Sequence, residues 1–392
     1  MPHVPTRPAP QRRRLATAAV GLLGVAALVS ACTSANGQGG PSTSSSSAAG
    51  GSAATTSATT AAKPQPKALT VASVSPAANA KAVATDSDVV VTLSTTLAST
   101  SALPKISPKV AGAWTRTTTA GHTTLRFTPT KPWPASTRVT VTVPAGLVST
   151  ESQKLAASHT ASFVTKAVSS ERVQQLLAKL GYLPLTFHVT GAAHTGKATA
   201  LAEAGSYSWK WSSARDVLAS YWSAGKPTNR LTRAALMDFQ RQHGLSTDGV
   251  AGPKTTAALI KDALAHRTDP NTYNYVHVSK ATHESLTLYV NGATKFHVAV
   301  STGITGATTY DGLFPVYAHM YYTRMRGTNV DGTKYDDNIY WASYFNGGEA
   351  MHAYPRASYG FPQSNGCVEI QPSNAKKIWP FTPVGTPVSI TG

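Results

Sequence analysis

Cys367 and His352 are the two residues whose types and spacing point most directly to chemistry. The chain has only two cysteines, and Cys367 lies 15 positions after His352. A thiol is a strong nucleophile only as the thiolate, and a nearby imidazole can hold that state. This length of chain allows a turn that brings both side chains together, so the spacing predicts a nucleophile and its proton-transfer partner. A buried, inert cysteine is the alternative that the spacing leaves open.

The residues around this pair carry a resemblance to a known family. His352, followed by Ser364-Asn365-Gly366-Cys367, resembles the active-site signature of the L,D-transpeptidases, a His and then Ser-x-Gly-Cys. The resemblance covers roughly the last 120 residues of the chain. It implies a β-rich, sandwich-like catalytic domain, which we place at residues 272–391. It implies no metal and no cofactor.

By this resemblance, the enzyme forms 3→3 cross-links in peptidoglycan. Cys367 attacks the carbonyl of the third residue of a tetrapeptide stem, often diaminopimelate, and D-alanine leaves as a thioester forms. An amine of a neighbouring stem then attacks the thioester. Such a cysteine acyltransferase of cell-wall synthesis would be a carbapenem target.

The resemblance also implies a role for each residue near the nucleophile. His352 moves protons, and the main-chain carbonyl of Ala353 orients its imidazole. Ser364 supports the loop, and the amides of Gly366 and Cys367 bind the oxyanion. No metal site is expected.

Three positions depart from the family pattern. Ala353 stands where Gly is common, Asn365 where His is common, and Glu369 where Arg or Asn is common. On a strand, Glu369 would share a face with Cys367, where it would repel a substrate carboxylate and attract an acceptor amine. Arg356 could supply the missing cation and contact substrate. Glu369 therefore motivates the hypothesis that the diaminopimelate is amidated, whereas an exposed Glu369 without a role is the alternative.

The elements that must position these residues read as strands. Leu286, Leu288 and Val290 alternate up to Asn291-Gly292, which predicts a hairpin with a two-residue turn. The stretch 321–346 is aromatic and polar without a clear period and could form a lid over a cleft. Tyr321, at its start, is a further candidate for contact with substrate.

Two domains are expected ahead of the catalytic one. Residues 68–168 hold short β-branched runs separated by Pro and Gly, which predicts an antiparallel sandwich that resembles bacterial immunoglobulin-like domains. Residues 169–268 switch to a helical period and resemble a three-helix peptidoglycan-binding domain. An insertion at about 184–229 interrupts the second resemblance. Its tryptophans are expected to close a local core rather than to stack on sugars, and they are Trp209, Trp211 and Trp222.

The amino-terminal segment is expected to be a targeting signal rather than part of the folded protein. Residues 1–32 carry arginines, an apolar stretch and Val29-Ser30-Ala31-Cys32, which resembles the lipobox of bacterial lipoproteins. Lipid on Cys32 would hold the protein at the outer face of the cytoplasmic membrane. Residues 33–67 are rich in Ser, Thr, Gly and Ala and predict a disordered tether into the wall. A plain secretion signal is the alternative.

Composition sets broad limits on partners. The net charge of +18 is spread along 392 residues, which argues against a nucleic-acid arm and fits an anionic surface of membrane phosphate or wall polymer. Simple solubility explains the charge equally well. The two cysteines have different contexts, so neither a disulfide nor a cysteine zinc site is expected.

Three rival functions remain open at this stage. The same Cys–His site with water as acceptor would make an L,D-carboxypeptidase or hydrolase. A non-catalytic wall-binding lipoprotein would not need both residues. A zinc peptidase would need clustered ligands, but the 12 histidines include no His-Glu-x-x-His motif.

Overall fold

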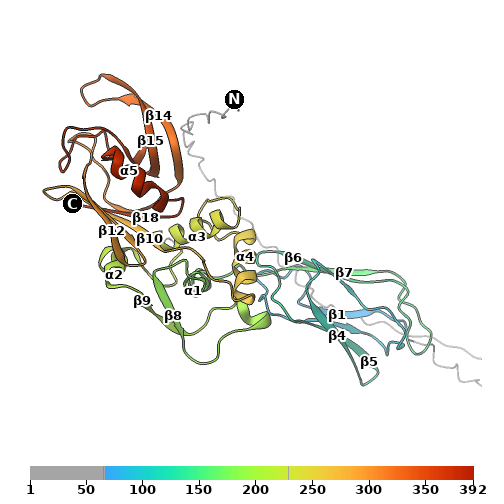
Figure 1. Ribbon diagram of the computed structural model, residues 1–392. Coiled ribbons are helices and arrows are strands. Elements are labelled where there is room, and N and C mark those ends of the chain that lie inside the picture. The colour runs from blue at the N-terminus through green and yellow to red at the C-terminus, as the bar shows by residue number, and fades with distance from the viewer. Residues whose placement is uncertain (1–64, 66, 228) are drawn as a thin grey trace, which may run out of the picture. The chain divides into compact units, whose positions relative to one another are not determined.

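The computed structural model describes residues 65, 67–227 and 229–392 (Figure 1). Residues 65 and 67–392, apart from 228, fall within one compact unit. The predicted signal segment, Cys32 and nearly all of the predicted tether lie outside the described residues. Among the described residues, no helix combines the length and apolarity that a membrane span requires.

The first domain is the antiparallel β-sandwich that the sequence predicts. Its two sheets have the strand orders β1-β2-β5-β4 and β3-β6-β7. Buried positions alternate along β2 and β6, and side chains from both sheets form one core around Trp133 and Phe163. The strands are β1 (Val71–Ser75), β2 (Val89–Leu93), β3 (Lys105–Ser107), β4 (Gly112–Thr119), β5 (His122–Pro129), β6 (Arg138–Val143) and β7 (His159–Val164).

The second domain contains the predicted helices. They are α1 (Ser170–Leu180), α3 (Arg230–Gln242) and α4 (Pro253–Leu264). The Ser169 side chain caps α1 by accepting a hydrogen bond from the Arg172 amide, and Gly181 ends the helix at φ 95°. The apolar faces of these helices share one core.

The insertion between α1 and α3 packs onto that core. Trp209, Trp211 and Trp222 are partly buried against it, as expected for residues that close a local core. Its elements are β8 (Leu185–Val189), η1 (Gly196–Ala200), β9 (Gly205–Trp209), α2 (Ser212–Leu218) and η2 (Ala219–Tyr221).

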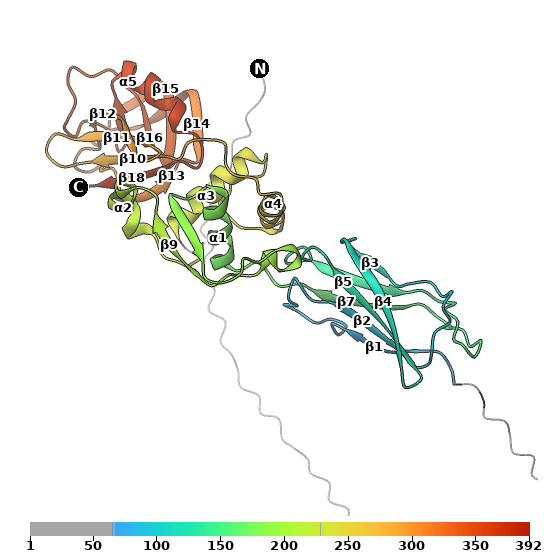
Figure 2. The same ribbon diagram turned by 60° about the horizontal axis from the view of Figure 1, so that its bottom comes forward.

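The third domain is built on one nine-stranded sheet with the order β13-β18-β10-β11-β12-β17-β16-β15-β14 (Figure 2). The predicted Asn291-Gly292 turn joins β11 to β12, with φ of 49° and 80°. Ala375 and Ile378 of α5 pack with buried strand residues in the core. The elements are β10 (Asn274–Ser279), β11 (Ser285–Val290), β12 (Ala293–Ser301), β13 (Gly312–Pro315), β14 (Ala318–Thr328), β15 (Lys334–Asn346), β16 (Glu349–Ala353), β17 (Val368–Ile370), α5 (Pro372–Ile378), η3 (Trp379–Phe381) and β18 (Pro387–Thr391).

The stretch 321–346 differs from the expected irregular lid. It forms most of a long antiparallel hairpin, in which β14 and β15 pair from Ala318↔Tyr344 to Thr328↔Lys334. Much of β14 is exposed or only half-buried on both faces, so its sequence lacks the polar–apolar alternation that marks a half-buried strand.

Glu203 fastens the insertion to α1, and we expect its loss to destabilise this domain. Its buried carboxylate accepts hydrogen bonds from Arg172, Lys179 and the His194 amide. Burial alone would raise the pKa of Glu203, but these contacts outweigh it and lower the pKa to about 2. Glu203→Gln leaves the buried Arg172 without a counter-charge and should cost about 3 kcal/mol.

Calorimetry of the helical-domain transition as a function of pH checks this expectation. The folded-state pKa lies below the unfolded value of about 4.3, so the stabilisation is present above that pH and is lost as the pH falls toward 2. Glu203→Gln should flatten this acid limb. Equal acid limbs in both proteins would contradict the assignment.

Candidate active site

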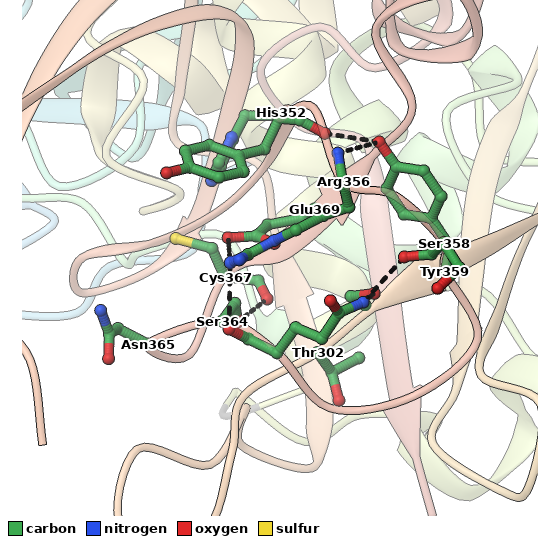
Figure 3. Close-up of polar contacts among 12 residues, drawn as sticks. Thr302, His352, Arg356, Ser358, Tyr359, Ser364, Asn365, Cys367 and Glu369 are labelled. Atoms are coloured by element: carbon green, nitrogen blue, oxygen red, sulfur yellow. Dashed lines mark hydrogen bonds and ion pairs between the residues drawn. The ribbon is translucent and has the colours of Figure 1, made fainter.

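Cys367 and His352 are brought together by two neighbouring parallel strands. β16 pairs with β17 in the register Met351↔Val368 and His352↔Glu369, and Cys367 directly precedes β17. Figure 3 shows the two side chains in the same region. Both line one cavity, whose walls include the tip of the β14–β15 hairpin. The sequence spacing therefore spans a loop that returns the chain to the adjacent strand.

The His352 ring is fixed by a single local contact. Its side chain is buried, and Nδ1 lies 3.0 Å from the carbonyl oxygen of Ala353. A carbonyl can only accept, so Nδ1 carries the proton and Nε2 keeps its lone pair. Burial lowers the pKa of His352, although the Ala353 carbonyl and Glu369 oppose that shift. The geometry thus holds a neutral imidazole with Nε2 as a base.

The thiol of Cys367 is also neutral at rest. Burial is the main cause that raises the pKa of Cys367 to about 12; the Ala350 amide opposes the rise, and the charges of Glu369 and Glu349 contribute to it. Sγ lies 3.8 Å from the carbonyl oxygen of Gly348. The pair is therefore a thiol beside a neutral imidazole, rather than the resting thiolate that the sequence suggested. Proton transfer must accompany substrate attack.

The loop before Cys367 is held by Ser364, which is buried. Ser364 Oγ donates to the Cys367 carbonyl oxygen at 2.6 Å and accepts from the Gly366 amide at 3.1 Å. Gly366 adopts φ 104°, a region that favours glycine. Ser364 thus makes hydrogen bonds within the loop that it was expected to support. The Gly366 amide, however, is directed at Ser364, which contradicts its expected place in an oxyanion hole.

Sequence reasoning missed a second set of supports beneath this loop. Thr309 Oγ1 donates to the Gly366 carbonyl oxygen and accepts from the Gly303 amide, each at 2.9 Å. The buried carboxylate of Glu284 accepts from the amide and the hydroxyl of Thr302 at 2.7 and 2.6 Å. The Ser-Thr-Gly run at 301–303 was a usable signal, but nothing in the sequence marks Thr309 or Glu284.

Arg356 and Glu369 form a bidentate ion pair that lines the cavity, with Glu369 buried and Arg356 half-buried. Arg356 Nε and Nη2 donate to Glu369 at 2.7 and 2.9 Å, and Nη2 also donates to the Gln363 carbonyl oxygen (Figure 3). Glu369 is only 5% exposed. Its charge is neutralised by Arg356, so it neither repels a substrate carboxylate nor motivates an amidated diaminopimelate. That hypothesis is withdrawn.

Two other predicted residues lie in different places. Asn365 lines the cavity, and its Nδ2 donates to Asn329 Oδ1 at 2.5 Å, which joins the catalytic loop to the hairpin tip. Tyr321 is 59% exposed and does not line the cavity. It packs instead with Tyr340, Trp341 and Trp379, and this position gives no support to its predicted contact with substrate. Within the described ranges, no group of three or more His, Cys, Asp or Glu side chains could hold a metal.

Comparison with known families identifies each of the three domains. Residues 273–390 match the L,D-transpeptidase catalytic domain, residues 65–165 the bacterial Ig-like domain, and residues 225–259 the peptidoglycan binding domain. The chain therefore carries an L,D-transpeptidase catalytic domain behind two wall-associated domains. This arrangement supports a peptidoglycan L,D-transpeptidase in an extracytoplasmic or cell-wall location. No curated protein matches the chain.

Several solved structures are similar to the chain. An L,D-transpeptidase from Mycobacterium smegmatis is 16% identical, with 83% of this chain and 100% of that chain covered and a TM-score of 0.29. L,D-transpeptidase 3 from Mycobacterium tuberculosis, in complex with a faropenem-derived adduct, is 14% identical, with 82% and 98% covered and a TM-score of 0.29. The catalytic domain of an Enterococcus faecium L,D-transpeptidase is 24% identical, with 30% and 96% covered and a TM-score of 0.28. The domain families, rather than these similarities, carry the identification.

The neutral resting thiol predicts how Cys367 reacts with iodoacetamide. The thiolate is the reactive form, so the alkylation rate should rise about tenfold for each pH unit and show no plateau below about pH 10. Mass mapping of the labelled peptides separates Cys367 from Cys32. A plateau near neutral pH would instead indicate a resting thiolate–imidazolium pair.

The ion pair beneath the site predicts a strong coupling between its partners. Arg356→Gln leaves the buried Glu369 uncompensated beside His352 and should cost about 3–5 kcal/mol in the catalytic-domain transition. Adding Glu369→Gln removes the stranded charge and should recover part of that loss. Calorimetry of the single and double variants measures the coupling, and losses that add within about 0.5 kcal/mol would contradict it.

Proposed function

We propose that this protein is a peptidoglycan L,D-transpeptidase that forms 3→3 cross-links through a thioester on Cys367. One observation carries the proposal: Cys367 and His352 line the same cavity, and the contact of His352 Nδ1 with Ala353 leaves Nε2 as the base. The catalytic-domain match at residues 273–390 supplies the substrate class.

The first half-reaction acylates the enzyme. Cys367 Sγ attacks the carbonyl of the third stem residue as Nε2 of His352 accepts the thiol proton. We assign the developing oxyanion to the Cys367 amide, because the Gly366 amide is directed at Ser364 Oγ. The C–N bond then breaks, His352 protonates the departing D-alanine, and a thioester remains.

The second half-reaction transfers the acyl group to an amine of a neighbouring stem. His352 is neutral again after D-alanine leaves, so Nε2 can accept a proton from the attacking nitrogen. Breakdown of the tetrahedral intermediate breaks the C–S bond and returns that proton to sulfur. The resting neutral pair is restored.

Arg356 is proposed to orient the donor stem. Its Nε and Nη2 are occupied by Glu369 and Gln363, and its side chain is 28% exposed on the cavity wall. An arginine held on one edge by a carboxylate is well placed to donate to a stem carboxylate from the other edge. The lipid anchor on Cys32 and attraction to anionic wall polymers stay predictions from the sequence.

Intact-protein mass spectrometry tests the thioester. After incubation with a carbapenem, the wild-type chain should gain one stoichiometric adduct, and Cys367→Ala should gain none although Cys32 is still present. His352→Ala should acylate at least about a hundredfold more slowly, because it loses the general base. Disaccharide-tetrapeptide should then yield cross-linked dimer and free D-alanine.

Calorimetry of each variant shows whether it is folded. A wild-type protein that forms no adduct, or an adduct that persists in Cys367→Ala, would overturn the proposal. Release of D-alanine without dimer would instead assign the same site to an L,D-carboxypeptidase.

A further inference from the structure

Glu349 is a buried carboxylate in the catalytic cavity that the mechanism above does not use. It begins β16, three residues before His352, and is 9% exposed. Its Oε1 accepts from the Tyr310 amide at 3.1 Å, and its Oε2 accepts from Asn346 Nδ2 at 3.0 Å. Both donors are neutral. No Lys, Arg or His side chain in the described part of the chain forms an ion pair with it.

The other buried carboxylates of the described residues differ from Glu349 in one of two ways. Three of them have ion-pair partners: Glu203 with Arg172 and Lys179, Asp262 with His243 and Arg267, and Glu369 with Arg356. Glu284 also has no cation, but it does not line the cavity. Among these five buried carboxylates, only Glu349 both lines the cavity and has no ion-pair partner.

Glu349 lies against the loop that carries the nucleophile. A Cβ built on Gly366 would be 3.7 Å from Glu349 Oε1, so the carboxylate is next to the residue before Cys367. Burial raises the pKa of Glu349, and its two hydrogen bonds and the more distant charge of Lys280, which forms its ion pair with Asp311, counter that effect. A carboxylate here also disfavours the thiolate of Cys367. The negative charge of Glu349 therefore does not help Cys367 to attack in the first half-reaction. A role for this charge is better sought in the second half-reaction, where the incoming acceptor amine is a cation.

We propose that Glu349 binds the protonated amine of the acceptor stem. The inference rests on the proposed transpeptidase function and names the acceptor subsite of the same cavity. It transfers to Glu349 the role in attracting an amine that the sequence suggested for Glu369. The two carboxylates divide the cavity: the neutralised Glu369–Arg356 pair lies on the donor side, and Glu349 lies on the acceptor side.

The transfer step balances with Glu349 as first proton acceptor. The ammonium gives one proton to the Glu349 carboxylate and becomes a neutral amine, which attacks the thioester carbonyl. A C–N bond forms, and the second proton passes from nitrogen to Nε2 of His352. The C–S bond breaks, and the departing sulfur takes that proton from His352. Amide, thiol and protonated Glu349 result, and Glu349 then releases its proton to solvent.

Glu349→Gln separates acceptor binding from acylation. The change keeps the shape of the side chain and an oxygen for the Tyr310 amide but removes the charge. With the full chain and disaccharide-tetrapeptide, we expect carbapenem acylation no slower than in wild type. The ratio of cross-linked dimer to hydrolysed tripeptide should fall about tenfold or more, because a hydrogen bond to a charged group is lost. Glu349→Asp should restore part of the ratio, and the surface change Glu151→Gln should leave it unaltered.

Two unreactive acceptor analogues test the same idea in the wild-type protein, independently of variant folding. In one, the acceptor amine is replaced by a dimethylamino group, which is cationic but forms no stable amide. In the other it is replaced by an uncharged methyl group. The cationic analogue should inhibit cross-linking about tenfold more strongly, and Glu349→Gln should abolish this preference.

The outcomes distinguish this inference from the proposed function. Wild-type protein that is not acylated would overturn the proposed function itself. Normal acylation with an unchanged dimer-to-tripeptide ratio in Glu349→Gln would overturn the Glu349 inference alone. Equal inhibition of the wild type by the two analogues would overturn it as well.

Discussion

The active site depends on the parallel pairing of two short strands. β16 carries His352, and β17 begins directly after Cys367, so the hydrogen-bonded register of the two strands holds the backbones of the proposed base and nucleophile close together. Ser364, Thr309 and the buried Glu284–Thr302 contact then hold the connecting loops in place. A reaction that needs precise geometry is best served when the reacting side chains lie on rigid strands and buried hydrogen bonds hold the adjoining loops.

The cavity contains carboxylates, and the one opposite His352, Glu369, is neutralised by an ion pair with Arg356. Glu369 faces His352 across the two strands, where a bare carboxylate would disturb both titrating groups, and Arg356 cancels it with a bidentate contact. Glu349 receives only neutral donors. The cavity is thus lined by one carboxylate in an ion pair and one without an ion-pair partner, and this asymmetry fits the proposed reaction of two chemically different substrates.

Local features of this chain could be read from its sequence, and long-range ones could not. The Asn291-Gly292 turn, the Gly181 helix end and the Cys–His spacing are set by neighbouring residues, so the pattern predicted them. The Arg356–Glu369 pair, the Thr309–Gly366 contact and the Glu284–Thr302 contact depend on how separate segments of the chain meet. The surroundings of Tyr321 could not be predicted, because a strand with two exposed faces resembles a loop in sequence and nothing local indicates that the ring packs against Tyr340 and Trp379.

The neutral resting thiol has a consequence for survival outside the cytoplasm. Oxidants and disulfides react with the thiolate, and the surroundings of an exported protein are oxidising. In the proposed mechanism Cys367 stays protonated until a stem peptide is in place, and burial thereby limits its conversion to sulfenic acid or to a mixed disulfide. The same desolvation that makes the nucleophile depend on its substrate therefore also preserves it, so the enzyme can hold an unpaired cysteine where most cysteines are oxidised.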